Sequence, residues 1–361
     1  MMDTDEIGYL GVAELGALYR ARKLSPVEVA KAVLERIERI DPMVNAMMRC
    51  TPDHALAAAR QSEMVFMRGD TARLLEGIPI TIKDLQPTKG VQTDYATAVM
   101  QGTIPDVDAP VVTRLLDAGG MLLGKTTSAA EWGWKGVSQA PISGITHNPW
   151  GKGLNAGASS SGAGVAAACG YGPLHQGGDG AGSIRMPAHF SGVFGLKPTY
   201  GRVPSWPISN NDLATHVGPL TRRVEDAALM LQAIAGPHPW DFTSLETSPQ
   251  DYAGQLKAAN MKGKRIGFTR DLGHASVDGD QDLRRLAGQE AGHPLDVVAL
   301  VGEVSILVEA AAVLLDQDRE VIGGEREADL AMTLLQEGRD EPLAIAVDLR
   351  CTQEEPLREA P

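Results

Sequence analysis

Apolar side chains in the first 70 residues recur at the three-to-four-residue spacing that is typical of amphipathic helices. The segment SPVE at residues 25–28 places serine at a cap position, proline in the first turn and glutamate three residues after the serine. This arrangement is a capping box, so a helix is predicted to begin there and to end at Asp41-Pro42. A second, alanine-rich helix is predicted over about residues 53–67.

From about residue 77 the pattern changes to short apolar runs that alternate with helical stretches. Residues 78–82 (IPITI) predict a strand ending at Lys83, residues 111–118 predict a helix, and residues 121–123 (MLL) predict the next strand. The alternation continues as far as residues 265–269. It predicts the α/β class, with a sheet sandwiched between helices.

Charge divides the chain of 361 residues into two parts. The formal net charge is −13, and residues 271–361 hold 21 acidic and 7 basic side chains, which leaves 25 acidic and 26 basic ones in residues 1–270. The last 91 residues also contain no Lys, Phe, Tyr or Trp. We therefore expect a core over residues 1–270, with N-terminal helices over 8–67 and an α/β part over 77–270. Neither the core nor the tail has the basic face of a nucleic-acid-binding protein.

The atypical tail over residues 271–361 is predicted to be partly helical or disordered. Residues 297–317 are apolar enough to form a docked helix, whereas the last dozen residues have the composition of a disordered segment.

The rest of the composition describes an ordinary globular protein, with 43% hydrophobic and 22% charged residues. The three cysteines, Cys50, Cys169 and Cys351, are far apart and have no CxxC spacing, so neither a disulfide framework nor a zinc site is predicted. The N-terminal segment carries acids where a signal peptide carries basic residues. No apolar run approaches the ~20 residues of a membrane helix. We expect a soluble cytoplasmic protein without membrane contact.

One motif suggests nucleotide binding but stands in the wrong context. Residues 119–126 (GGMLLGKT) match the GxxxxGK[ST] pattern of a phosphate-binding P-loop. A P-loop follows a strand and precedes a helix, whereas here a predicted helix comes first and the interior of the motif is Met-Leu-Leu. The pattern therefore favours a buried strand followed by a turn.

Two clusters of small residues, GASSSG at 157–162 and GAGS at 180–183, flank an alanine-rich helix and a short strand. Small residues let the backbone approach a ligand closely and direct successive N–H groups at one point. A nest of this kind can stabilise the oxyanion of an acyl-transfer intermediate. An isolated Gly/Ser cluster is more often only a turn, but the serine at the end of the second cluster, Ser183, is also placed to act as a nucleophile.

A nucleophilic serine needs a base, and the histidines offer no candidate. No Gly-x-Ser-x-Gly elbow surrounds the clustered serines, and no HExxH motif is present for a metal. The remaining candidate is Lys83, at the end of the apolar strand. A lysine is usually solvated, but burial penalises the ammonium ion, so a buried lysine can be neutral near pH 7 and act as a base.

Several segments resemble the amidase signature family: GIPITIKD, GASSSG, GGDGAGSIRMPA, GVFGLKPTYGRVP and HVGPLTRRVEDAALML. They occur in the family's order over roughly residues 8–270, and the serine block is long and specific. The resemblance implies one large domain with a mixed, twisted β-sheet covered by helices on both faces. It also implies catalysis without a metal or another cofactor, and makes residues 77–270 the catalytic part.

Carried over residue by residue, the resemblance makes Ser183 the nucleophile, Ser159 the serine that follows a cis peptide bond, and Lys83 the catalytic lysine. The oxyanion-hole amides are those of Gly180, Ala181, Gly182 and Ser183, and the supporting polar residues are Asp179, Arg185 and Ser160. Trp132 and Trp134 are candidates to line the substrate pocket, although aromatic residues near a helix more often belong to the core.

The implied reaction is hydrolysis of a small carboxylic amide at its linear C–N bond. Neutral Lys83 accepts a proton from Ser159, and Ser159 accepts one from Ser183 as Ser183 attacks the carbonyl carbon. An arylamide or a simple aliphatic amide is the favoured substrate. Because the family also includes glutamine amidotransferase subunits, a glutaminase role stays open. A homodimer is the one protein partner that we consider.

The chain departs from the family at several positions. Ala158, Ser161 and Ala181 stand where relatives usually have glycine, and the methyl groups at 158 and 181 are tolerable only where φ is negative. Family members also continue well beyond the point at which the resemblance stops. A catalytically impaired scaffold that keeps the serine loops and acts as a binding partner is therefore an alternative to an active amidase.

Overall fold

The computed structural model describes residues 3–207, 215–246, 250–259, 298–301 and 304–307. Its strands are β1 Met47–Cys50, β2 Ile78–Lys83, β3 Gly120–Thr126, β4 Gln139–Ala140, β5 Gly144–Ile145, β6 His147–Asn148, β7 Gly151–Asn155, β8 Leu174–Asp179, β9 Phe194–Gly195, β10 His216–Thr221, β11 Val298–Val301 and β12 Val304–Leu307.

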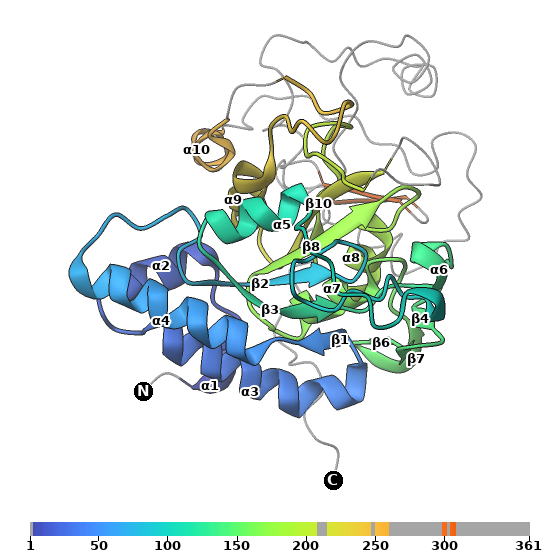
Figure 1. The fold of residues 1–361 in the computed structure, drawn as a ribbon, viewed down its shortest axis with the longest axis horizontal. Coiled ribbons are helices and arrows are strands. Elements are labelled where there is room, and N and C mark those ends of the chain that lie inside the picture. The colour runs from blue at the N-terminus through green and yellow to red at the C-terminus, as the bar shows by residue number, and fades with distance from the viewer. Residues whose placement is uncertain (1–2, 208–214, 247–249, 260–297, 302–303, 308–361) are drawn as a thin grey trace, which may run out of the picture.

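The central sheet has the strand order β1-β3-β2-β8-β10-β9 (Figure 1). Strands β3, β2 and β8 run parallel to one another, whereas β1, β10 and β9 each pair antiparallel with a neighbour. The remaining strands form the two-stranded pairs β4-β5, β6-β7 and β11-β12. The sheet is therefore mixed, and the predicted α/β class is confirmed.

The helices surround this sheet and lie mostly between its strands along the chain (Figure 1). They are α1 Thr4–Gly8, α2 Val12–Arg20, α3 Pro26–Val44, α4 Pro52–Arg68, a 3₁₀ helix at Ala98–Met100, α5 Pro110–Asp117, α6 Ala130–Gly133, α7 Ser161–Ala168, α8 Arg185–Ser191, α9 Val224–Ile234 and α10 Tyr252–Ala258. No helix among the described residues is both long and apolar enough to cross a membrane.

Strands β2 and β3 form the buried middle of the sheet. Every residue of both strands is buried, and side chains alternate between the two faces of a strand, so both faces are covered at this point. The segment 119–126 that matched a P-loop is mostly β3, which pairs with β2 along its length. Its backbone belongs to the sheet and forms no loop around a phosphate group. The predicted strand is confirmed.

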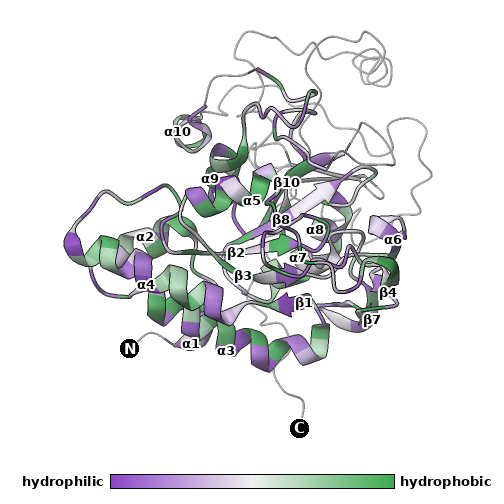
Figure 2. Cartoon of the chain, in the orientation of Figure 1, coloured by the Kyte–Doolittle hydropathy of each residue, from purple (hydrophilic) through white to green (hydrophobic). Residues whose placement is uncertain are grey.

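Helix α3 begins as its local sequence predicts. Ser25 accepts a hydrogen bond from the amide of Glu28 at 3.1 Å, and the amide of Ser25 donates to the Glu28 carboxylate at 2.8 Å. Along α3 and α4, hydrophilic and hydrophobic residues alternate in the manner of amphipathic helices (Figure 2). The capping box is confirmed.

The predicted end of this helix is wrong by two residues. Helix α3 continues through Pro42 to Val44 and ends at Asn45, which has the left-handed conformation (φ 54°). A proline inside a helix removes one hydrogen bond to the preceding turn and crowds the carbonyl group there, which more often ends or kinks the helix. Here the Asp41 carboxylate accepts a hydrogen bond from the amide of Ala46 at 2.8 Å, which stabilises the chain beyond the proline.

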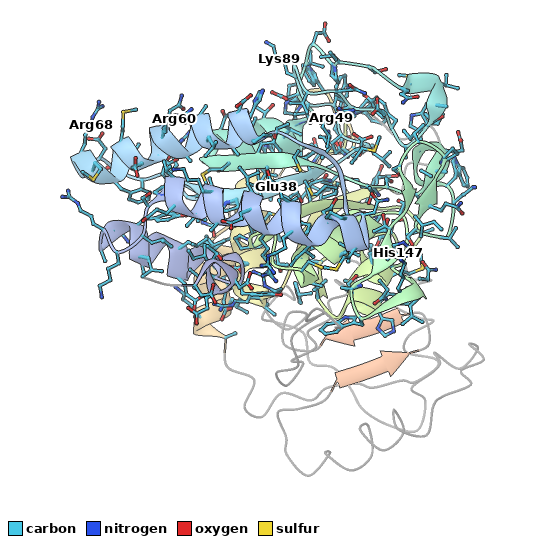
Figure 3. All side chains as sticks on the ribbon, turned by 90° about the horizontal axis from the view of Figure 1, so that it is seen from below. Glu38, Arg49, Arg60, Arg68, Lys89 and His147 are labelled. Carbon is cyan, nitrogen blue, oxygen red and sulfur yellow. The ribbon has the colours of Figure 1, made fainter. Side chains whose placement is uncertain are left out.

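Helix α4 is one residue longer at each end than the predicted 53–67. Ala55, Ala59 and Ser62 are buried on its inner face. Arg60 and Arg68 extend from the opposite side into solvent (Figure 3). These N-terminal helices cover the sheet without contributing to the site described below.

In the tail, the structure describes only β11 and β12, which pair antiparallel. The helix predicted over 297–317 is wrong for this part, because Val298, Val301, Val304 and Ile306 are β-branched and favour strands. The rest of the tail and the strand predicted at 265–269 lie outside the described residues. The domain boundary at residue 270 therefore stays a prediction.

Candidate active site

Lys83 is the last residue of β2 and only 2% exposed. Its Nζ atom donates hydrogen bonds to the Oγ atoms of Ser159 at 2.7 Å and Ser160 at 2.9 Å. The backbone amide of Lys83 donates to Oε1 of Gln176 on β8 at 3.1 Å, which ties the end of β2 to the neighbouring strand. The predicted burial of this amine is confirmed.

Burial lowers the pKa of Lys83 to about 7, although the Asp179 carboxylate acts in the opposite direction. The desolvation penalty falls on the ammonium form, so a large share of the molecules hold a neutral amine at neutral pH. A neutral amine has a lone pair that can accept a proton from a hydroxyl group.

Ser159 lies in the loop that leads into α7, and it follows a cis peptide bond from Ala158. The Ser159 side chain is buried, and the backbone carbonyl oxygen of Ser159 accepts a hydrogen bond from the amide of Ala129 at 3.2 Å. Among the described residues, Lys83 is the only hydrogen-bond partner of Ser159 Oγ. That hydroxyl group can therefore form a second hydrogen bond with another group.

Ser160 connects the two clusters of small residues. Its amide donates to the carbonyl oxygen of Ser183 at 3.1 Å. Its Oγ atom donates to the Gly178 carbonyl oxygen at 3.1 Å and accepts from the Gly178 amide at 3.2 Å. The partly buried Ser183 thus lies in a loop joined to the Ser159–Ser160 loop.

The topology of the sheet explains why these segments meet. Strands β2 and β8 are parallel neighbours, so their carboxyl ends lie at the same edge of the sheet. Lys83 ends β2, and Asp179 ends β8 just before the loop of residues 180–183. Segments that are about a hundred residues apart in the chain are therefore adjacent in space.

Asp179 is fully buried and holds the loop that carries Ser183. It accepts two hydrogen bonds from the Arg185 guanidinium group at 2.9 Å each, and others from the amides of Gly182 at 2.7 Å and Ile184 at 3.1 Å. Burial alone would raise the pKa of Asp179, but Arg185 and these amides outweigh it and lower the pKa to about 2. The carboxylate is therefore charged at neutral pH and braces the loop.

The predicted oxyanion-hole amides differ in their surroundings. The Gly182 amide is directed at Asp179, so this geometry counts against Gly182 as a donor to an oxyanion. No described residue accepts a hydrogen bond from the amides of Gly180, Ala181 or Ser183. Ala181 does not adopt a positive φ, and neither does Ala158, so both methyl groups are tolerated.

The tryptophans are not core residues, because Trp132 is 37% and Trp134 is 67% exposed. Gly133 lies between them and packs against Ser159: a Cβ atom added to Gly133 would be 2.7 Å from Ser159 Oγ. Both tryptophans are therefore direct sequence neighbours of a residue that packs against the candidate site. Their contact with a substrate stays a prediction.

A second buried lysine, Lys125 on β3, enters the sequence motifs only as part of the P-loop pattern. It is fully buried, and burial lowers its pKa to about 7. The one signal that indicated its burial is its place in the apolar run of residues 121–126. Among the described residues, no group of three or more His, Cys, Asp or Glu side chains is arranged to hold a metal ion.

Residues 28–296 match the family model described as Amidase. The chain therefore belongs to the amidase family, whose signature segments were identified in the sequence. It is 38% identical over 279 residues to an acylamidase of Rhodococcus erythropolis, covering 77% of this chain and 58% of that protein. It is likewise 38% identical over 270 residues to a glutamyl-tRNA(Gln) amidotransferase subunit of Gloeobacter violaceus, covering 74% of this chain and 55% of that protein.

The fold is also that of solved amidase signature enzymes. The crystal structure of a bacterial aryl acylamidase matches with a TM-score of 0.70 and 30% sequence identity, over 79% of this chain and 59% of that chain. This chain thus spans between 55% and 59% of the length of these three relatives.

Proposed function

We propose that this chain hydrolyses a small carboxylic amide to an acid and an amine through an acyl-serine intermediate on Ser183. The observation that carries the proposal is the buried amine of Lys83, which is hydrogen-bonded to Ser159 and lies beside the loop of Ser183. Family membership supports the reaction class.

In the first half of the reaction, Ser183 Oγ attacks the carbonyl carbon of the amide. The Ser183 proton passes to Ser159 Oγ, and the Ser159 proton passes to the neutral amine of Lys83. The negative charge that develops on the carbonyl oxygen is stabilised by the amides of Gly180, Ala181 and Ser183. The relayed proton then reaches the leaving nitrogen as the C–N bond breaks.

In the second half, water attacks the acyl-serine carbonyl carbon, and the same relay accepts the proton of that water. The acid is released when the bond to Ser183 Oγ breaks and this oxygen regains its proton. Asp179 keeps the nucleophile loop in place throughout, because its carboxylate holds Gly182 and Arg185. Every step uses side chains and amides of the chain, so we propose that no cofactor takes part.

The substrate class follows from the relatives and the surroundings of the site. We propose a small amide, either an arylamide or a simple aliphatic amide, because acylamidases are among the relatives and two exposed tryptophans flank Gly133, which packs against Ser159. A glutaminase role within a larger assembly is the alternative that the amidotransferase relatives favour. A cytoplasmic location and a homodimer belong to the proposal as well.

A serine-reactive fluorophosphonate probe tests the nucleophile directly. We expect covalent labelling at Ser183 that Ser183→Ala abolishes and Lys83→Ala strongly reduces. Ser161→Ala and Lys152→Ala are the matched controls, because Ser161 is the first residue of α7, two positions after Ser159, and Lys152 is a solvent-exposed lysine. Labelling at another serine, or labelling that Lys83→Ala leaves unchanged, would contradict the mechanism.

The second candidate function is that of a catalytically impaired scaffold. The observation that favours it is the Gly182 amide, one of the expected oxyanion donors, which is already hydrogen-bonded to Asp179 at 2.7 Å. A folded protein that never reacts with the probe, and that releases no amine from any amide in a panel, would favour the scaffold over the enzyme.

A further inference from the structure

Lys125, the buried lysine that the proposed mechanism does not use, holds the segment that follows Lys83. Its Nζ atom donates hydrogen bonds to the Gln86 carbonyl oxygen, to Thr88 Oγ1 at 2.7 Å and to Thr93 Oγ1 at 3.2 Å. All three acceptors lie between residues 86 and 93. One amine on β3 thus fixes both ends of this segment.

Asp84, the residue directly after Lys83, holds the next part of the same segment. Its Oδ2 atom accepts a hydrogen bond from the Asp94 amide at 3.1 Å, and its carbonyl oxygen accepts one from the Tyr95 amide at 3.2 Å. Its Oδ1 atom is buried and has no hydrogen-bond partner among the described residues. Burial raises the pKa of Asp84 to about 6, against the attraction of the Lys125 charge.

Residues 95–97 in turn pair with the segment that contains the two tryptophans. The amide of Trp132 donates to the Tyr95 carbonyl oxygen and that of Glu131 to the Ala96 carbonyl oxygen, at 3.3 Å each. Thr97 Oγ1 donates to Glu131 Oε2 at 3.1 Å.

Four of these residues, Tyr95, Ala96, Glu131 and Trp132, have φ between 53° and 56°. Non-glycine residues rarely adopt this conformation, and it persists where surrounding contacts hold it in place. The two segments therefore depend on each other and on the groups that anchor residues 84–97.

The far end of this chain of contacts reaches the proposed relay serine. Gly133 packs against Ser159 Oγ, and the Ala129 amide donates to the Ser159 carbonyl oxygen at 3.2 Å. A continuous series of hydrogen bonds thus runs from Lys125 through residues 86–97 and 131–132 to the surroundings of Ser159. None of these contacts involves the side chain of Lys83.

We propose that Lys125 and Asp84 are positioning residues for the amidase site. They fix residues 86–97, and through them the segment Trp132–Gly133 that packs against Ser159 and holds it in place. The inference rests on the proposed function for the role of Ser159. Stability alone does not account for the arrangement, because a buried amine and carboxylate cost desolvation free energy that an apolar pair of similar volume avoids.

Two variants act at opposite ends of the series. Lys125→Met removes the anchor and keeps much of the side-chain volume, whereas Thr97→Val removes only the hydrogen bond to Glu131. Misplacing a reacting group by about 1 Å can cost on the order of 100-fold in rate, so we expect kcat per labelled active site to fall about 10- to 100-fold in both variants. Thr97→Ser keeps the hydroxyl group and should restore most of the rate.

The control is Tyr19→Phe, which removes a buried hydrogen bond to the Gly77 carbonyl oxygen, just before the start of β2 and outside this series of contacts. We expect it to lower thermal stability but to leave kcat per labelled site unchanged. The midpoint of the pH–rate profile should stay the same in Lys125→Met, because the contacts of the Lys83 side chain are intact. An unchanged kcat per labelled site in Lys125→Met and Thr97→Val would overturn the inference.

Hydrogen exchange gives a readout that does not require activity. In Lys125→Met the amides of Glu131 and Trp132 should exchange at least about tenfold faster, while amides of α4 keep their protection. If those two amides exchange as in the unmodified protein, the positioning role is wrong whether or not the chain is an enzyme. If their exchange changes but the unmodified protein neither labels nor hydrolyses amides, the proposed function fails and the structural link stands.

Discussion

Lys83 Nζ and Ser159 Oγ lie 2.7 Å apart in an interior position where the lysine is only 2% exposed. One atom belongs to the end of a central strand and the other to the loop before α7. The contact joins a buried amine, which can be neutral near pH 7, to a hydroxyl group that can give it a proton, and this pair is the centre of the proposed mechanism.

The pH dependence of the reaction should follow the titration of Lys83. Because its pKa is lowered to about 7, the amine carries a proton below that pH and cannot accept another. We expect kcat/KM to rise about tenfold per pH unit below pH 7 and to level off above it. A rate that stays flat across this range would exclude Lys83 as the base, provided that circular dichroism shows the fold intact.

Replacing Lys83 should stabilise the protein while it abolishes activity. The folded-state pKa lies below the ordinary value of 10.5, so the unfolded chain binds the proton more strongly between about pH 7 and 10.5, and stability rises with pH through this window. Lys83→Met removes that cost, which at ~1.4 kcal/mol per pKa unit is at most about 5 kcal/mol. Urea unfolding at neutral pH should show the gain, and it should shrink as the pH approaches 10.

The exposed Lys152 provides the control for this measurement, because Lys152→Met should change the free energy of unfolding little. If Lys83→Met is less stable than the unmodified protein at pH 7, the two hydrogen bonds of the amine outweigh its desolvation.

The three consecutive serines should differ sharply in their importance. Ser159→Ala removes the proposed relay and should lower kcat on the order of 10²- to 10⁴-fold, the usual contribution of a positioned acid–base group. Ser160→Ala removes hydrogen bonds to Gly178 and Lys83 and should cost at most about 30-fold, since two bonds at ~1 kcal/mol each amount to ~2 kcal/mol. Steady-state kinetics on one amide substrate give kcat for the three single-serine variants and allow a direct comparison.

Ser161→Ala should behave like the unmodified protein, because Ser161 Oγ is buried and has no hydrogen-bond partner among the described residues. A loss in Ser160→Ala as large as that in Ser159→Ala would move the relay from Ser159 to Ser160.

Asp179→Asn should weaken both the fold and the site. It leaves Arg185 without its carboxylate partner and should lower the free energy of unfolding by roughly 3 kcal/mol at neutral pH, in the range for a broken buried pair. The Asp179 pKa of about 2 lies below its ordinary value of 3.8, so this stability is present above pH 4 and is lost as the pH falls toward 2. The difference between the two proteins should therefore narrow over that interval.

Denaturant unfolding at several pH values measures this difference, and the labelling rate of Ser183 reports on the loop at neutral pH. Full labelling in a destabilised Asp179→Asn protein would show that Asp179 braces the fold but not the nucleophile.

Local sequence is enough to predict elements whose stabilising groups are near one another in the chain. The capping box of α3 joins residues three positions apart, and the apolar runs of β2 and β3 mark buried strands without reference to the rest of the fold. The helix end predicted at Pro42 is wrong, because the Asp41 carboxylate continues to hold the chain after the proline. The small-residue clusters indicate a backbone nest, but they do not distinguish a simple turn from a site that stabilises an oxyanion.

By itself, the sequence determined the α/β class and the strand that ends in Lys83, and through the family resemblance it predicted which serines take part in the reaction. Only the tertiary structure decided that the amine is buried against Ser159, that the Gly182 amide is engaged by Asp179, and that Lys125 anchors the segment after Lys83. The physical reason is that burial and hydrogen bonding between distant residues arise where the carboxyl ends of neighbouring parallel strands meet, and no local pattern encodes that meeting.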